Sequence, residues 1–448
     1  MDFADQITAG EQAVAAGRAD AAIALADGLY KAGCTDVAVF VFHARALDLA
    51  LRPLAALTVL ADGLATHPLS GRLRVERGKI LARQGDAAQA EAAFDDALTV
   101  DPRQMEAVKG ILSLRPMPLD DPRLALVTAT AMDTDRPPNK RAKPFYILGQ
   151  VWLEAGEIDP AMAFYAQANA LMALGHDPAA QEYRFASGAF DITREVLAEH
   201  PRTVPLTPNC PAVLIAGLPR SGKTLAEKLL TRSGGVHAGG ELALLSRYAR
   251  ELDWTQGAGA VVAGLATLTQ SPLARRYTAA AEGRRFVTDT SPPTLFRLGV
   301  MAALHPDVPV VLCHRDPLDL AAAMYVKQFR RGNLFTTRLD TLGRAIARAE
   351  RLMAHWLDTL PNPVLHLAYE DTARDPDDTT RHLAALIGQP APPRTEARPP
   401  KRLHPARASD GPPGPALIGF ARPLARHLKP AMAAYHAEKE RLSLSRPR

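Results

Sequence analysis

The sequence predicts an α-helical repeat array followed by a three-layer α/β domain with a mostly parallel sheet. In the first part of the chain, small and large residues recur with helical spacing, and Pro68 and Pro102 are 34 residues apart. From Cys210 onward, short apolar runs alternate with helical stretches, which is typical of a parallel sheet covered by helices. Between the first apolar run and the helix after it lies a glycine-rich turn, Gly217–Thr224.

The composition limits the classes of protein to consider. The 448 residues are enough for two or three domains with cores of their own. The formal net charge of +5 suits an anionic ligand but is too small to argue for nucleic acid, so we expect no nucleic-acid partner. We see no apolar run of about 18 residues and no secretion signal, so we expect no membrane span and a cytoplasmic location. The cysteines Cys34, Cys210 and Cys313 lack the spacing of metal ligands, so we expect reduced thiols and no metal.

The helical array is expected over residues 1–175. Its clearest unit, Gly71–Gln104, has small residues where two antiparallel helices approach and a proline where the second helix ends. The positions that define this unit are Gly78, Leu81, Gly85, Ala90, Phe94, Ala97 and Pro102. Three weaker units flank it, and residues 115–139 are rich in proline and fit the pattern poorly. The array resembles the tetratricopeptide repeat family, which implies a concave surface for a protein or peptide partner. An array that packs only against its own C-terminal domain fits the residues equally well.

The rest of the chain divides into a connector and the α/β domain. Residues 176–209 are expected to be a helical connector and linker, and residues 210–448 the α/β domain, with a Pro-rich loop at about 389–416. The expected strands are Val213–Ala216, Arg285–Asp289, Val308–Cys313 and Pro363–Tyr369, and the expected helices are Thr294–Leu304, Leu318–Phe329 and Leu339–Leu360. In such a sheet, a ligand binds at the carboxyl ends of the strands.

The turn Gly217–Thr224 fits the pattern G-x-x-x-x-G-K-[ST] of loops that bind phosphate groups. Such a loop presents backbone N–H groups to phosphate oxygens at the N-terminus of a helix, where the helix dipole favours negative charge. The pattern indicates a phosphate-bearing ligand without saying which one. It therefore allows an ATP- or GTP-dependent kinase or NTPase.

The loop and the segments after it resemble the sulfotransferase family, in particular its tyrosylprotein branch. In chain order, the segments that carry the resemblance are Leu218-Pro-Arg-Ser-Gly-x-Thr-Leu225, Gly234–Glu241, Asp289–Asp319, Asp340–Trp356 and Tyr369–Pro376. They cover about residues 210 to 390, and bacterial members often carry an N-terminal tetratricopeptide array. The resemblance implies a P-loop domain that moves a sulfuryl group from 3′-phosphoadenosine-5′-phosphosulfate to a hydroxyl of a sugar, lipid or protein.

The resemblance also implies roles for individual residues. Glu241 takes the proton of the acceptor hydroxyl, while Arg220 and Lys223 stabilise charge on the departing 5′-phosphate. Fixed cations make a metal unnecessary. The residues expected to bind the co-substrate are Gly217, Pro219, Arg220, Ser221, Gly222, Lys223, Thr224 and, at its 3′-phosphate, Arg315. Two alternatives stay open: Glu241 as a charge at a helix N-terminus, and Arg315 as half of a structural ion pair.

This sequence departs from the family pattern at several positions. Lys223 stands where members usually have Thr, and Thr290 stands where they usually have Lys, so we hypothesise that a cationic group has moved from one place to the other. Ala323 replaces a Ser that contacts the 3′-phosphate, and Gly419–Arg422 matches the family's Gly-Arg-Trp only loosely. These losses leave a third function open, a catalytically degenerate sulfotransferase fold that serves as a tetratricopeptide interaction protein.

Overall fold

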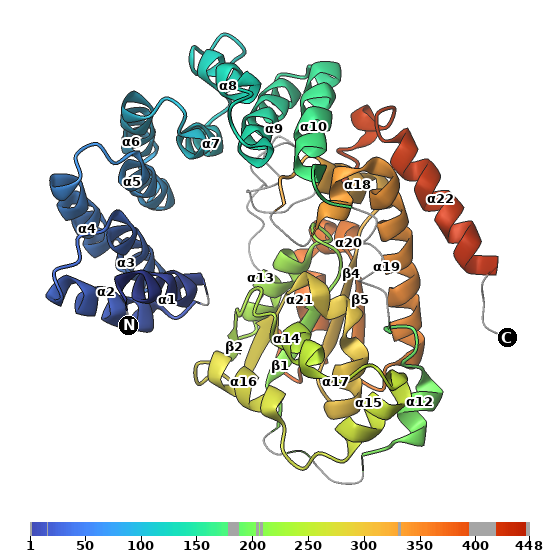
Figure 1. The fold of residues 1–448 in the computed structure, drawn as a ribbon. Helices are drawn as coiled ribbons and strands as arrows, with labels where there is room; N and C mark the ends of the chain where they lie inside the picture. The colour runs from blue at the N-terminus through green and yellow to red at the C-terminus, as the bar shows by residue number, and fades with distance from the viewer. Residues whose placement is uncertain are drawn as a thin grey trace. The chain divides into compact units, whose positions relative to one another are not determined.

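A computed structural model describes residues 2–15, 17–177, 188–202, 206, 209–329, 333–393 and 418–444 (Figure 1). The chain divides into two compact units, Met1–Leu171 and Met172–Arg448. Part of the expected connector at 176–209, and most of the Pro-rich loop expected at about 389–416, lie outside the described residues. None of the described helices is long and apolar enough to cross a membrane.

The first unit is built from helices alone within its described residues. They are α1 Phe3–Ala15, α2 Ala19–Lys31, α3 Val37–Leu49, α4 Pro53–Thr66, α5 Gly71–Arg83, α6 Ala87–Val100, α7 Met105–Leu114, α8 Arg123–Met132, α9 Pro138–Glu154 and α10 Ile158–Ala173. Several begin at a residue whose side chain accepts a hydrogen bond from the first turn, as Asp36, Ser70 and Asp86 do. From α1 to α7 each helix packs against the next, α8 packs against α9, and α5 with α6 is a closely packed pair.

Glycines let the paired helices of this unit approach closely. A Cβ atom on Gly78 of α5 would lie 2.6 Å from the ring of Phe94 on α6, and Gly110 of α7 faces the same ring. On α9, a Cβ atom on Gly149 would lie 2.8 Å from the ring of Tyr165 on α10. The core of the unit therefore depends on aromatic rings that fill the space left by absent side chains.

The helix α8 lies in the proline-rich stretch that fits the repeat pattern poorly. Prolines precede it at Pro118 and Pro122 and follow it at Pro137. Because they flank the helix instead of interrupting it, they leave its backbone hydrogen bonds intact. The helix packs against α9.

The second unit contains a 5-stranded sheet in the order β2-β3-β1-β4-β5, in which all neighbours are parallel. The strands are β1 Ala212–Ala216, β2 Val236–His237, β3 Phe286–Asp289, β4 Val310–His314 and β5 Val364–Ala368. Four of them lie within two residues of the expected bounds. The sequence did not predict β2, because two residues give no apolar run.

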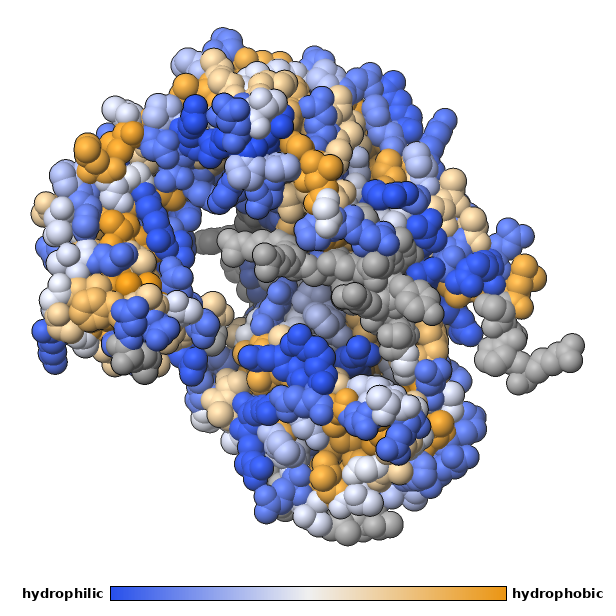
Figure 2. All heavy atoms as spheres, in the orientation of Figure 1, coloured by the Kyte–Doolittle hydropathy of each residue, from blue (hydrophilic) through white to orange (hydrophobic). Residues whose placement is uncertain are grey.

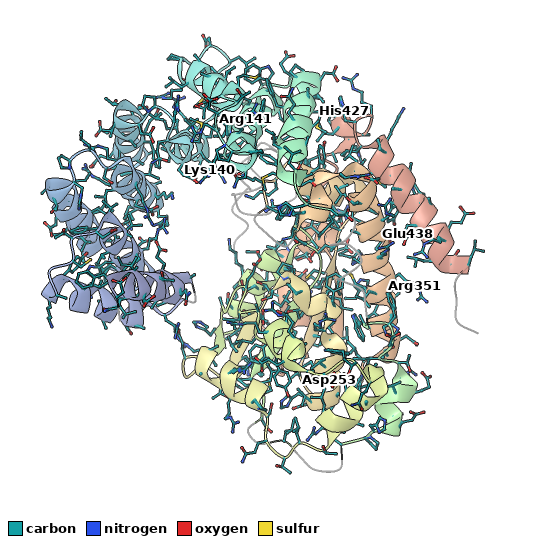
Figure 3. The ribbon with its side chains drawn as sticks, viewed as in Figure 1. Lys140, Arg141, Asp253, Arg351, His427 and Glu438 are labelled. Carbon is teal, nitrogen blue, oxygen red and sulfur yellow. The ribbon has the colours of Figure 1, made fainter. Side chains whose placement is uncertain are left out.

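The helices of the second unit are α12 Arg194–Glu199, α13 Lys223–Thr231, α14 Leu244–Glu251, α15 Gly257–Ala266, α16 Pro272–Ala280, α17 Leu298–Leu304, α18 Pro317–Tyr325, α19 Leu339–Thr359, α20 Tyr369–Arg374, α21 Pro376–Leu386 and α22 Lys429–Leu444. Short 3₁₀ turns span Pro292–Phe296, Leu334–Thr337 and Arg422–Leu424. The long helix α19 packs along α22, the helix that carries Glu438 (Figure 3). This buried glutamate accepts a 2.7 Å hydrogen bond from Arg348 of α19.

Helices cover both faces of the sheet, giving three layers (Figure 1). On β1, Val213 and Ile215 belong to an apolar cluster with residues of α13 and α21. Neighbouring residues of a strand point to opposite faces, so Leu214 and its register partner Asp289 face the other layer. That layer includes α16, whose Tyr277 hydroxyl donates to Asp289.

The surface of the helical unit carries scattered exposed leucines. Leu51 is 88%, Leu54 77% and Leu69 80% exposed. Polar and apolar side chains are interspersed over the visible face of the molecule (Figure 2). Single exposed apolar residues of this kind are ordinary for a folded chain.

Candidate functional site

The carboxyl ends of the five strands bring the candidate site together. Because the strands are parallel, these ends lie along one edge of the sheet. The segments that follow them are Gly217–Gly222 after β1, residues 238–243 after β2, Thr290 and Ser291 after β3, Arg315 after β4, and Tyr369 after β5. Every site residue expected from the sequence lies in these segments or in the first turn of α13.

The Gly217–Gly222 loop has a tightly constrained backbone. At Gly217, φ is +156°, and a Cβ atom would collide with the carbonyl oxygen of Cys313 on β4 and lie 2.5 Å from Oγ of Ser221. At Arg220, φ is +72°, a value uncommon for a residue with a side chain. Gly222, with φ of +102°, immediately precedes the first turn of α13. The loop therefore turns sharply between a strand and a helix, with Pro219 buried inside it.

Ser221 offers a buried hydroxyl to this loop. The residue is 1% exposed, and its Oγ has no hydrogen-bond partner among the described residues. A buried hydroxyl without a partner is unfavourable, so a bound acceptor would stabilise it. Thr224, in contrast, is exposed in the first turn of α13.

Lys223 folds back over the loop. Its Nζ donates a 2.9 Å hydrogen bond to the carbonyl oxygen of Gly217, and the residue is 6% exposed. Burial lowers the pKa of Lys223 to about 8, and the negative charges of Glu241 and Asp289 oppose that fall. The ammonium group is thus held at the loop, within electrostatic reach of Glu241.

Arg315 joins the end of β4 to the loop. It is 4% exposed, and its Nη1 donates to the carbonyl oxygen of Arg220 at 3.4 Å. The guanidinium lies 4.3 Å from the ring centre of Tyr369 and 5.3 Å from that of Phe420. Its Nη2 is 3.9 Å from Asp319, and burial lowers the pKa of Arg315. The ion pair with Asp319 that the sequence allowed is therefore present, at a long distance.

Asp319 links Gly419 and Ala421, near the C-terminus, to Arg315. Its carboxylate accepts backbone hydrogen bonds from Gly419 at 2.6 Å and from Ala421 at 3.0 Å. Burial raises the pKa of Asp319, while these two donors oppose the rise. Sequence analysis matched the segments Asp289–Asp319 and Gly419–Arg422 to the family pattern but gave Asp319 and Phe420 no role, because a contact across a hundred residues leaves no local pattern.

Glu241 lies outside any helix. It is exposed, and α14 begins three residues later at Leu244, after Ala243 with φ of +55°. The expectation that Glu241 opens a helix was therefore wrong. The left-handed backbone conformation of Ala243 separates Glu241 from the first turn of α14. The interpretation of Glu241 as a charge at a helix N-terminus loses its basis.

Two of the positions that depart from the family pattern, Thr290 and Ala323, are buried. Thr290 is 5% exposed, and its N–H donates to the carbonyl oxygen of Gly240 at 2.8 Å. Ala323 is 6% exposed within α18. Thr290 supplies no cation and Ala323 no hydroxyl where the family pattern has one, whereas Arg220, Lys223 and Arg315 lie at the carboxyl ends of the strands.

Both oxygens of Asp289 are occupied by protein donors. The residue is fully buried. Its Oδ1 accepts from the N–H of Ser291 at 3.0 Å and from its Oγ at 2.5 Å, and Oδ2 accepts from Tyr277 at 2.8 Å. The Asp289 carboxylate therefore has a structural role, holding Ser291 and Tyr277 by hydrogen bonds.

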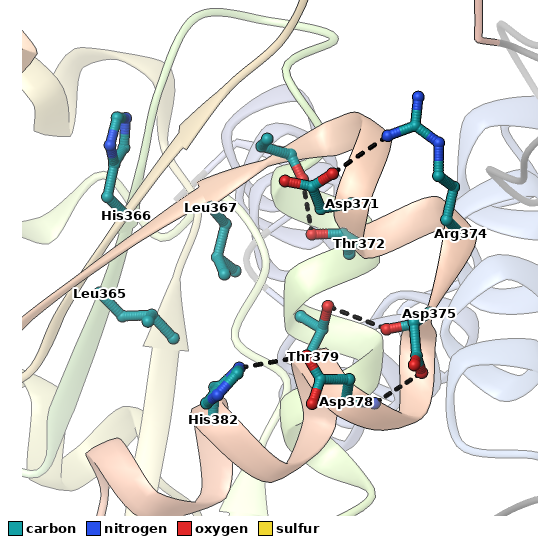
Figure 4. A pocket seen from close by; sticks show the side chains of 11 residues that line it. Leu365, His366, Leu367, Asp371, Thr372, Arg374, Asp375, Asp378, Thr379 and His382 are labelled. Atoms are coloured by element: carbon teal, nitrogen blue, oxygen red, sulfur yellow. Dashed lines mark hydrogen bonds and ion pairs between the residues drawn. The ribbon is translucent and has the colours of Figure 1, made fainter.

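A pocket of about 430 Å³ lies between β5, α20 and α21. Its charged groups pair with one another: Arg374 donates to Asp371 at 3.1 Å, and His382 lies 3.6 Å from Asp378 (Figure 4). His366 points away from these carboxylates. The pocket is thus a separate feature from the Gly217–Gly222 loop.

Comparison with known proteins supports a sulfotransferase domain. Residues 211–393 match the sulfotransferase family, a span that includes the loop, Glu241 and Arg315 but less than half of the chain. A protein of Aquifex aeolicus (strain VF5), described as uncharacterized, is 23% identical over 278 residues, or 57% of this chain. The chain spans 35% of the length of that relative.

Proposed function

We propose that the second unit transfers a sulfuryl group from 3′-phosphoadenosine-5′-phosphosulfate to an acceptor hydroxyl. The observation that carries the proposal is the convergence of a glycine loop, three cations and one exposed carboxylate at a single edge of the sheet. The unsatisfied hydroxyl of Ser221 and the absence of a side chain at Gly217 suit a bound oxyanion. The acceptor is a hydroxyl of a sugar, lipid or protein.

In the proposed reaction, the acceptor oxygen forms a bond to sulfur as the bond from sulfur to the 5′-phosphate oxygen breaks. Glu241 accepts the proton that the hydroxyl loses. Arg220 and Lys223 stabilise the negative charge that grows on the departing phosphate. Arg315 binds the 3′-phosphate, and its aromatic neighbours Tyr369 and Phe420 fix the plane of the guanidinium. No step requires a metal, since positioning and fixed charges supply the effect.

The state of Asp289 favours sulfuryl transfer over a kinase or NTPase. Enzymes of the latter class use a strand-end Asp to hold Mg²⁺. Here both carboxylate oxygens of Asp289 accept hydrogen bonds from Ser291 and Tyr277. A metal would have to reach a fully buried carboxylate that already accepts three hydrogen bonds.

The catalytically degenerate alternative is the weaker one. Thr290 and Ala323 lack the groups of the family pattern, yet Lys223 supplies an ammonium group within reach of Glu241. We propose that this lysine serves in place of the missing one at position 290.

For the first unit, we propose a tetratricopeptide array that binds a protein or peptide partner. The pairs α5–α6 and α9–α10, with glycine opposite an aromatic ring, suit such repeats. The thiols of Cys34, Cys210 and Cys313 are free and buried, in keeping with a cytoplasmic, reducing location.

Calorimetry with two ligands tests the function. We expect tight binding of adenosine 3′,5′-bisphosphate and none of ATP with Mg²⁺. The reverse result would establish the NTPase alternative, and binding of neither would favour the degenerate fold. Lys223→Ala should abolish transfer of labelled sulfate to phenol and sugar acceptors, and unchanged activity would refute the role of Lys223.

A further inference from the structure

The segment that carries Glu241 is held on its N-terminal side by a buried carboxylate of α13. Glu227 Oε1 accepts a hydrogen bond from the N–H of Gly240 at 3.0 Å and another from Oγ1 of Thr288 at 2.5 Å. The Thr288 hydroxyl in turn accepts from the N–H of Gly239 at 3.0 Å. Two consecutive amides just before Glu241 are thus fixed by side chains.

The same segment is held on its C-terminal side by a different group. The N–H of Ala243 donates to Oγ of Ser291 at 2.6 Å, and that hydroxyl donates to buried Asp289 at 2.5 Å. Tyr277 of α16 completes this chain. Glu241 therefore lies between two fixed points, with only Leu242 between it and the second.

The two attachments come from opposite faces of the sheet. Thr288 and Asp289 are neighbours on β3, so their side chains point to opposite sides. Thr288 reaches Glu227 in the α13 layer, and Asp289 reaches Tyr277 in the α16 layer. Movement of the segment toward either layer would break one set of bonds.

Glu227 is a buried acid whose described partners are hydrogen-bond donors without charge. It is 8% exposed, and no Lys, Arg or His forms an ion pair with it among the described residues. A buried carboxylate without a cation is costly even when it accepts hydrogen bonds. Such exceptions to ordinary burial concentrate at functional sites.

Glu227 also lies one helical turn after Lys223. Four residues of α-helix advance about 6 Å along the axis. The helix that begins at the Gly217–Gly222 loop thus also holds the segment of Glu241, so one rigid element sets the spacing between them.

We propose that Glu227 is a positioning residue that fixes Glu241 relative to Lys223 and the bound sulfate donor. This role rests on the proposed sulfotransferase function. Glu227 itself touches neither donor nor acceptor. It acts through the Gly240 amide and Thr288, so that the carboxylate of Glu241 meets the acceptor hydroxyl when that hydroxyl faces the sulfur.

The test compares two substitutions in the full chain. Glu227→Met keeps the approximate volume and removes both acceptors, so kcat for sulfotransfer should fall about a hundred-fold, the cost of misplacing a catalytic group by about 1 Å. Glu227→Gln keeps the acceptor oxygen, so its kcat should stay within about tenfold of wild type. Affinity for adenosine 3′,5′-bisphosphate should be unchanged in both, because the phosphate-binding groups are intact.

A double-substitution cycle separates positioning from general loss of structure. Glu241→Gln should abolish most of the turnover, and adding Glu227→Met to it should lower turnover no further, because both changes remove one function. Equal falls in bisphosphate affinity and turnover, or a further fall in the double variant, would overturn the proposal. If Glu227→Met does not fold, Thr288→Val removes the bonds that the Thr288 hydroxyl makes to Glu227 and Gly239 and leaves the bond from Gly240 to Glu227, so kcat should fall by less than in Glu227→Met with affinity unchanged.

Amide hydrogen exchange provides a readout that does not depend on activity. The Gly240 amide should be protected in wild type and Glu227→Gln, and should exchange faster in Glu227→Met. If wild type neither binds the bisphosphate nor transfers sulfate, the proposed function fails, while this exchange result still decides whether Glu227 holds the segment. Equal exchange in all three proteins would show that it does not.

Discussion

Two glycines of the helical unit and two of the sheet unit accommodate different neighbours. In the helical unit, Gly78 and Gly149 each make room for the ring of an aromatic side chain on the paired helix. In the sheet unit, Gly217 and Gly239 each lie against a main-chain carbonyl oxygen, of Cys313 and Thr288 respectively. A ring can shift by a small rotation, whereas a strand carbonyl cannot move without the sheet. Tight packing in the first unit is thus a matter of stability, and in the second it sets the shape of the site.

The largest expected effect is at Gly217. Gly217→Ala would place a methyl group against the Cys313 carbonyl and Ser221 Oγ, and should lower bisphosphate affinity by about a hundred-fold or more. Calorimetric titration with adenosine 3′,5′-bisphosphate measures this loss of affinity. The matched control is Gly234→Ala, at φ of +74° with no atom within 4 Å, which should cost about 1 kcal/mol of stability and leave affinity unchanged. Equal affinity losses in both would show that backbone conformation, and not contact, matters at Gly217.

The next effect is at Gly78, in the helical unit. Gly78→Ala overlaps the ring of Phe94 and should destabilise the unit by about 1–3 kcal/mol. Bisphosphate affinity of the folded protein should not change. Denaturant unfolding measures the cost, and combining the change with Phe94→Leu should recover part of it. A strictly additive pair would contradict the ring contact as the cause.

A smaller effect is expected from pH. The pKa of Lys223 is lowered to about 8, so its ammonium loses the proton as pH rises through 8. A bound anion favours the charged form, so binding takes up a proton above pH 8. Affinity should therefore be flat below pH 8 and fall above it by up to about tenfold per pH unit. Calorimetry in Lys223→Thr should lack this fall, and an identical profile would assign it to another group.

The smallest effect is expected on the surface of the helical unit. Arg72 and Glu11 pair at 3.0 Å with side chains 46% and 45% exposed, so Glu11→Gln should change the free energy of unfolding by less than about 1 kcal/mol. Glu76 is buried between Arg45 and Lys79, so Glu76→Gln should cost more. Denaturant unfolding compares the two, and the opposite ranking would contradict the burial argument.

The sequence predicted the sheet where local pattern and final environment agree. The runs at β1, β3, β4 and β5 are apolar because helices cover both faces of a parallel sheet. The strand β2 has two residues and no such run. The helix α8 was missed because prolines surround it, although none interrupts it.

The site was predictable in part for the same reason. The loop residues Gly217 and Lys223 follow a local spacing, so sequence alone could name them. From the sequence alone, a charged residue such as Glu227 would be assigned to the exposed face of its helix. Only its contact with Thr288 of β3 shows that it is buried. Asp319 and Phe420 depend on a partner a hundred residues away.

The contact between Asp319 and Gly419 also affects the order in which parts of the chain can fold during synthesis. During translation, Arg315 is synthesised well before the segment that contains Phe420. That segment also contains Gly419 and Ala421, whose amides donate hydrogen bonds to Asp319. The helical unit, whose contacts join neighbours in sequence, has by then emerged and can fold. The helical unit can thus be folded while Arg315 still lacks one of its two aromatic neighbours. The contacts of Arg315 with Phe420, and of Asp319 with the Gly419 and Ala421 amides, can form only after residue 421 has been synthesised.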